Sequence, residues 1–230
     1  MSKSTPYNFQ HFKISHFDFE NFQGPKEGGP ALNFKALTID GTSVQLSDYF
    51  DQLVILSFGS YSCPHFAGHI EEMNELKMKY PQAHFLVLYT RETHPGGRVP
   101  VHHSMQEKLK MAKKTQQELK DQRRILVDDL EGSAHKKYGA LPNAVYVIDT
   151  QKEILYRDEW ESPGRIESVL ECYFKKEPID TDQIKKIPRK SKSGIYHFIK
   201  LLKLAGIVSI WDLIKAIVIE VKGDPKKVKF

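Results

Sequence analysis

Two runs of apolar residues predict two buried strands in the first half of the chain. Residues 53–58 read LVILSF and residues 84–89 read HFLVLY. Continuous aliphatic runs of this length are typical of strands covered on both faces. Between them, from Phe66 onward, apolar residues return every three or four positions, the period of an amphipathic helix. The pattern therefore predicts a strand–helix–strand unit.

Shorter elements flank this unit. Alternating residues at 34–50, centred on Asp40-Gly41, predict a β-hairpin. Further strands are predicted at 125–128, 140–149 and 154–157, the last two as a hairpin, and helices at 133–139 and 164–175. Strands that alternate with helices and end in a hairpin indicate an α/β fold, a mixed sheet flanked by helices.

Residues 91–124 form an insertion after the second buried strand, with a loop followed by a charged helix at about 105–120.

At 197–215 polar or small residues recur at every third position, and on one straight helix this stripe would rotate by about 60° per step. We therefore predict two amphipathic helices broken near Gly206. Internal lysines argue against a membrane span. An anionic membrane surface, a partner subunit in a homodimer and the chain's own domain remain as alternatives for their apolar faces.

The charge is unevenly distributed. The net charge is +5, yet residues 185–230 hold 12 Lys or Arg against 3 Asp or Glu, which leaves −4 for the rest. The main domain thus lacks the basic surface that binding to nucleic acid requires.

We predict an aromatic N-terminal extension at 1–30, a core domain at 31–178, and a basic linker with an amphipathic helical tail at 179–230. The phenylalanines of the extension are expected to pack across the domain, with a ligand-binding arm as the alternative.

The chain has two cysteines, Cys63 and Cys172, far apart in sequence. This excludes a disulfide scaffold and a cysteine-based zinc site, and it fits a reducing compartment. The first residues lack the apolar core of a signal peptide. We expect a cytoplasmic protein, with peripheral membrane contact through the tail left open.

Cys63 is the candidate nucleophile. It follows the first buried strand and precedes Pro64 at the start of the predicted helix. Free N–H groups and the helix dipole at such a position favour thiolate over thiol. The order of elements, with Pro142 just before the terminal hairpin, resembles the thioredoxin fold, in which a cis-proline faces the active-site cysteine. We therefore expect Pro142 to be cis.

The cysteine motif differs from several thioredoxin-fold families. Dithiol oxidoreductases need a second cysteine three residues away, where this chain has Ser60 and Phe66. Copper-delivery proteins need one at the position of Ala67. The peroxiredoxin loop is matched by Ser60 but not by Leu56, which stands where its proline belongs.

Four segments together resemble the iodothyronine deiodinases: residues 58–66, 86–95, 100–104 and 138–148. In that family selenocysteine stands at the position of Cys63. The resemblance extends from about residue 32 to residue 174. It implies a thioredoxin-like fold with a deiodinase-type insertion, and a thiol-dependent oxidoreductase that performs reductive dehalogenation with a redox-active cysteine.

The chain also departs from the family's pattern. Cys63 is less acidic than selenocysteine and a poorer leaving group. Tyr61 replaces a neighbouring cysteine that would be the nearest resolving thiol. Ala144 stands where the family has an arginine that clamps the iodothyronine carboxylate. The family's N-terminal membrane anchor is not found in this sequence. The chemistry can carry over without the hormone specificity.

The resemblance implies roles for further residues. Glu92, His94 and His102 would supply protons and hold the phenol, since an imidazole titrates near working pH. His103 could take the role of the adjacent His102. Expected substrate-binding residues are Ser60, Tyr61, Pro142 and His103. No metal site is expected, because no Asp, Glu or Cys completes a ligand set with the histidines.

The leading hypothesis is thiol-dependent dehalogenation of an iodothyronine or another halogenated phenol. The alternatives are a one-cysteine, peroxiredoxin-like peroxidase and a non-enzymatic interaction protein of thioredoxin fold. No bound cofactor is expected. Cys172 lies on the last core helix, too far to form a disulfide with Cys63, so an external thiol such as glutathione or thioredoxin is the expected reductant.

Overall fold

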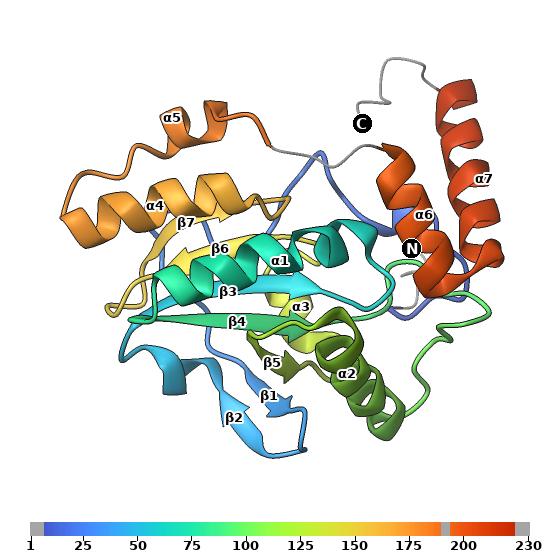
Figure 1. The fold of residues 1–230 in the computed structure, drawn as a ribbon, viewed down its shortest axis with the longest axis horizontal. Coiled ribbons are helices and arrows are strands. Elements are labelled where there is room, and N and C mark those ends of the chain that lie inside the picture. The colour runs from blue at the N-terminus through green and yellow to red at the C-terminus, as the bar shows by residue number, and fades with distance from the viewer. Residues whose placement is uncertain (1–6, 190–193, 224–230) are drawn as a thin grey trace, which may run out of the picture.

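A seven-stranded sheet forms the centre of the computed structural model, which describes residues 7–189 and 194–223 (Figure 1). The strand order is β2-β1-β5-β4-β3-β6-β7. The strands are β1 (Lys35–Thr38), β2 (Ser43–Gln45), β3 (Leu53–Gly59), β4 (Ala83–Tyr89), β5 (Arg124–Val127), β6 (Val145–Ile148) and β7 (Ile154–Asp158). The helices are α1 (Pro64–Lys79), α2 (Met105–Leu119), α3 (Ser133–Lys137), α4 (Pro163–Lys175), α5 (Thr181–Lys186), α6 (Gly194–Ala205) and α7 (Ile207–Gly223). This confirms the predicted mixed α/β sheet.

The register of the central strands decides which loops meet. β3 and β4 are parallel, and their last residues, Gly59 and Tyr89, lie opposite each other. The loop that carries Cys63 and the loop that starts at Thr90 therefore leave the same edge of the sheet. β6 pairs antiparallel with β3 and β7 with β6, as the predicted terminal hairpin requires.

Successive residues of β3 point to opposite faces of the sheet, and each face has its own core. On one face Leu53 and Ile55 pack with residues of α1 and α4, which lie in front of the sheet in Figure 1. On the other face Val54 and Leu56 pack with the region of α3 and with the N-terminal segment. The continuous apolar run in the sequence reflects this burial on both sides.

The N-terminal phenylalanines pack across the sheet as predicted. Phe9 and Phe17 are buried in the same core as Val54, and Phe12, Phe19 and Phe22 pack against it. We call residues 7–30 the N-terminal arm. It covers a face of the sheet that no long helix covers, so its aromatic side chains bury that face in place of a helix.

The C-terminal tail contains two helices, α6 and α7, broken at Gly206 as predicted. Gly206 has a φ of +90°, a conformation that glycine adopts without strain. We call α6 and α7 the C-terminal hairpin. The sequence did not predict α5, which begins after Asp180, whose carboxylate accepts a hydrogen bond from the Gln183 amide at 3.0 Å. Parts of the predicted linker and tail, 190–193 and 224–230, lie outside the described residues.

Candidate active site

Cys63 is the residue that caps the N-terminus of α1. Its amide donates to the Ser60 carbonyl at 3.1 Å, and its carbonyl accepts from the Ala67 amide at 3.0 Å. The tight turn depends on Gly59, because a Cβ there would lie 2.2 Å from the Phe66 ring. A small residue at the end of β3 thus lets Phe66 fold back under the loop and fix the cysteine.

The Cys63 side chain is buried, with 1% of its surface exposed. Burial raises the pKa of its thiol to about 11, although the amides of Phe66 and His65 and the Thr93 hydroxyl act to lower it. The predicted N–H donors of the helix terminus are present. The predicted preference for thiolate is wrong in this covered arrangement, because desolvation of the charged sulfur outweighs these donors.

Glu92 connects the cysteine loop with the insertion. One carboxylate oxygen accepts hydrogen bonds from the amide and hydroxyl of Ser62, at 2.9 and 2.6 Å. The other accepts from the Tyr89 hydroxyl and lies 3.3 Å from Nε2 of His102. Burial alone would raise the pKa of Glu92, but His102, Ser62 and Tyr89 bring it below its usual value. The structure therefore holds an ionised carboxylate next to the cysteine loop.

His94 is buried beside this network. Its amide donates to the Ser62 hydroxyl at 3.0 Å, and its ring centre lies 4.3 Å from that of Phe12. Nδ1 of His94 has no hydrogen-bond partner among the residues that the structure describes. Burial lowers the pKa of His94 to about 3, so its imidazole is neutral at physiological pH. A neutral ring with one unused nitrogen is suited to binding a polar group of a ligand.

Ser60 lies at the other side of the cysteine. Its hydroxyl is 3.2 Å from that of Thr93 and accepts from the Thr93 amide at 3.1 Å. The sequence singled out Ser60 but not Thr93, Ser62 or Tyr89. Ser62 and Thr93 are adjacent in sequence to Cys63 and Glu92, but their contacts join segments about 30 residues apart. Tyr89 contacts Glu92 three residues further along the chain.

Of the remaining predicted site residues, Tyr61 and His102 are buried and His103 is exposed. Tyr61 is buried, and its hydroxyl donates to Glu118 at 2.7 Å. His102 is buried against Glu92, whereas His103 is exposed and its amide donates to Glu107 at 2.7 Å. The structure thus separates the two adjacent histidines: His102 belongs to the network and His103 does not.

The expectation that Pro142 is cis is wrong, because no peptide bond in the described chain is cis. The trans form is the more stable one for most X–Pro bonds. Here the preceding carbonyl, that of Leu141, lies 2.8 Å from Nε2 of the buried His135. Pro142 itself is buried before β6.

Two segments from the ends of the chain cover the site. The Ser209 hydroxyl of α7 donates to the carbonyls of His94 and Pro95, at 3.2 and 3.1 Å. Leu204, Ala205 and Ile210 of the hairpin belong to the same apolar cluster as Cys63. The N-terminal arm contributes Phe12, and Nδ1 of His11 lies 2.9 Å from the Asp212 carboxylate. Arm and hairpin therefore meet at His94, beside the buried cluster that contains Cys63.

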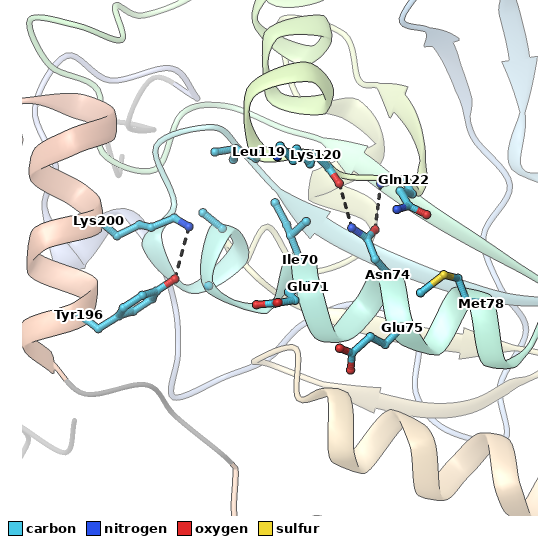
Figure 2. A pocket seen from close by; sticks show the side chains of 12 residues that line it. Ile70, Glu71, Asn74, Glu75, Met78, Leu119, Lys120, Gln122, Tyr196 and Lys200 are labelled. Carbon is cyan, nitrogen blue, oxygen red and sulfur yellow. Dashed lines mark hydrogen bonds between the residues drawn. The ribbon is translucent and has the colours of Figure 1, made fainter.

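A groove lies further along α1, on the side of α6 (Figure 2). Its volume is about 440 Å³, and it is lined by residues of α1, the end of α2 and α6. Figure 2 shows Tyr196 and Lys200 reaching from α6 toward Ile70 and Glu71 of α1. Ala67 is the lining residue nearest to Cys63 in sequence, and none of Cys63, Glu92, His94 and His102 lines the groove. Within the described ranges no three His, Cys, Asp or Glu residues are grouped so that they could hold a metal ion.

Solved structures that are similar to this chain show the fold. A hypothetical protein from Sinorhizobium meliloti superposes with a TM-score of 0.56 at 15% identity, covering 69% of this chain and 90% of that one. A putative thiol:disulfide interchange protein, DsbE, from Chlorobium tepidum has a TM-score of 0.52 at 17% identity, covering 65% and 98%. The fold is thioredoxin-like, as predicted.

Sequence relatives give the family. Type I iodothyronine deiodinase of Xenopus laevis is 28% identical over 159 residues, which are 63% of this chain and 62% of that protein. Thyroxine 5-deiodinase of Sparus aurata is 26% identical over 111 residues, 44% of this chain and 41% of that protein. The chain thus spans less than two thirds of the length of either relative. The sequence model of the iodothyronine deiodinase family matches residues 5–164. The chain belongs to the iodothyronine deiodinase family.

Proposed function

We propose that the protein is a thiol-dependent oxidoreductase that removes halogen from a phenolic substrate, with Cys63 as the nucleophile. The observation that carries this proposal is the buried Glu92 network, which joins the cysteine loop through Ser62 to Tyr89 and His102. Membership of the deiodinase family supports the same reaction class. The iodothyronine is one candidate substrate, and Ala144 in place of the family's arginine favours a phenol without that carboxylate.

The proposed reaction has two stages. The Cys63 sulfur attacks the halogen, an S–halogen bond forms, and the C–halogen bond breaks with its electron pair left on the aryl carbon. That carbon takes up a proton. One external thiol then displaces halide from the sulfur and forms a mixed disulfide, and a second thiol releases Cys63 as the free thiol. The aryl carbon is reduced, and the two external thiols are oxidised to a disulfide.

The residues of the site have matching roles in this proposal. His94 is neutral and has a free Nδ1, so it binds the phenol hydroxyl. Glu92 and His102, 3.3 Å apart, hold the proton that leaves the thiol and return it to the aryl carbon. Ser60 and Thr93 position the sulfur, and Tyr61 lines the cluster around it. His103 is exposed and Pro142 is trans, so neither is included.

Substrate must displace part of the cover before it reaches Cys63. Burial holds the thiol pKa at about 11, and water that enters with the substrate reduces this penalty. The helix N–H groups, which lower the pKa of the Cys63 thiol, then stabilise its thiolate. Opening of the cover and activation of the nucleophile are therefore one event in this proposal.

The experiment is iodide release from iodothyronines, iodotyrosines and simple iodophenols with dithiothreitol as reductant. Cys63→Ser should abolish release, and Cys172→Ser should retain it, because Cys172 lies on α4 outside the network. If the wild-type protein releases no iodide from any of these compounds, the proposed activity is wrong.

A one-cysteine thiol peroxidase is the second candidate function. The Thr93 hydroxyl beside the sulfur favours it, with the Ser60 hydroxyl 3.2 Å further on, since such donors can bind a peroxide oxygen. Rapid consumption of hydrogen peroxide with sulfenic acid on Cys63 would select this function. Oxidation no faster than that of free cysteine would exclude it.

A further inference from the structure

Large apolar side chains lie exposed on the outer face of the C-terminal hairpin. Ile207 is 65% exposed and Trp211 58%. Among the side chains that the structure describes, those exposed on this face are Ile199, Leu202, Ile207, Val208, Trp211 and Ile214. Elsewhere in the described chain only Leu32 and Met78 are large, apolar and exposed. The exposed apolar surface of the protein is therefore concentrated on two adjacent helices.

These side chains form a continuous face on each helix. At about 100° per residue, the exposed apolar residues of α7 fall within an arc of about 120°. Ser209 falls on the opposite side of α7 and Ile210 falls beside the arc, next to Ile214. Both are buried: Ser209 contacts the His94 carbonyl, and Ile210 belongs to the apolar cluster that contains Cys63. Figure 1 shows α6 and α7 side by side at one end of the molecule. One face of the hairpin packs on the loop that carries His94 and joins the apolar cluster of Cys63, and the other is open to solvent.

Lysines share the exposed apolar face. Lys203 and Lys215 are exposed and fall on the same helical arcs as Ile199 and Trp211. Asp212 precedes Lys215 on α7, but its carboxylate is buried and faces His11. It therefore adds no negative charge to the exposed face. From residue 185 to the end the chain has 12 Lys or Arg against 3 Asp or Glu. The face is thus apolar and aromatic, and each of its two helices adds an exposed lysine to it.

We propose that the outer face of the C-terminal hairpin docks on an anionic lipid surface, with α6 and α7 lying in the plane of the interface. An apolar arc with a tryptophan and flanking lysines is the pattern of an interfacial helix. Among the described residues no helix is long and apolar enough to cross a membrane. A second copy of the chain is a poorer occupant, because it would bring two strongly cationic tails together.

Docking would also fix the position of the candidate active site. The hairpin covers Cys63 with its inner face, so a docked protein holds the site about one helix diameter, about 10 Å, from the lipid. The proposal does not depend on the chemistry of Cys63, and its test requires no activity assay.

The test uses the full chain and vesicles of two compositions: phosphatidylserine mixed with phosphatidylcholine, and phosphatidylcholine alone. A Trp160→Phe background leaves Trp211 as the only tryptophan. We expect cosedimentation with the anionic vesicles and a blue shift of Trp211 emission, both weakened by salt. Lys203→Gln and Lys215→Gln should each lower the vesicle affinity about fivefold.

Ile207→Ser and Met78→Ser form a matched pair, because the two side chains are 65% and 64% exposed and only the first is on the hairpin. Ile207→Ser should lower vesicle affinity at least about threefold, from the loss of part of a buried aliphatic side chain, and Met78→Ser should leave it unchanged. No binding to anionic vesicles, or equal loss in both variants, would overturn the proposal. A stable dimer that Ile207→Ser converts to monomer, without vesicle binding by either form, would assign the face to a second copy instead.

Discussion

Replacing Gly96 with alanine is expected to uncover Cys63. A Cβ at position 96 would lie 2.3 Å from the Ser209 hydroxyl and 2.8 Å from the Ala205 carbonyl. The carbonyl is backbone at the end of α6, so the strain cannot be relieved by rotation of a side chain alone. The hairpin must move away from the loop, and this loosens the cover over the cysteine.

The size of the effect follows from the cost of overpacking. An added carbon in a close-packed contact destabilises it by about 1–3 kcal/mol. If this cost falls on the covered state alone, the equilibrium shifts toward the open state by a factor of about 5 to 150. Since alkylation requires an open site, the rate of Cys63 modification by iodoacetamide should rise by the same factor.

Gly97→Ala is the matched control, because a Cβ there would meet no atom within 4 Å. Both variants are made in a Cys172→Ser background, which leaves one thiol, and thermal unfolding checks that both remain folded. Ser209→Ala provides a second test, since it removes hydrogen bonds to two loop carbonyls. It should accelerate alkylation about two- to tenfold. Equal rates in all folded variants would refute the idea that the hairpin limits access to Cys63.

Further predictions concern the site itself. Glu92→Gln should lower kcat about 10²- to 10⁴-fold in the iodide-release assay without unfolding the protein, because it removes the charge that pairs with His102. The alkylation rate of the covered wild type should rise about tenfold per pH unit and level off only near a pKa of about 11, as fluorescence-detected labelling would show. Folding raises the pKa of this thiol from 9.0 to about 11, so the unfolded chain loses the proton at lower pH than the folded protein does. The free energy of unfolding, measured by urea titration at each pH, should therefore decrease as the pH rises from 9 to 11. Asp212→Asn should change alkylation at most about fivefold, because its partner His11 is 62% exposed. Cys172→Ser should keep full turnover with dithiothreitol, and mass spectrometry should find no Cys63–Cys172 disulfide.

Local patterns predicted the elements of the fold well. The apolar run of β3, the turn at Asp40-Gly41 and the break at Gly206 each determine backbone structure through nearby residues. The placement of Cys63 at the start of α1 follows from the same local signals. These features need no knowledge of distant contacts, which is why the sequence alone was sufficient.

Contacts between distant segments could not be predicted in this way. The high pKa of Cys63 depends on its burial, in an apolar cluster that includes Ala205 and Ile210, about 140 residues away in sequence. The choice of His102 over His103 depends on which side of the loop faces Glu92. Ser62 and Thr93 gain their roles only when the ends of β3 and β4 are brought together. The sequence therefore indicated the candidate nucleophile but not the environment that surrounds it.

The most direct test of the central proposal is a single turnover without reductant. The Cys172→Ser protein, in excess over an iodophenol, should form the dehalogenated phenol with at most one product per Cys63. Without a thiol, water displaces iodide from the Cys63 sulfur and leaves a sulfenic acid. Digestion and mass spectrometry should then find this sulfenic acid trapped by dimedone, and dithiothreitol added in place of dimedone should restore the thiol. Cys63→Ser with Cys172→Ser should form no product. Dehalogenation by that double variant, or turnover that leaves Cys63 unmodified, would contradict the account.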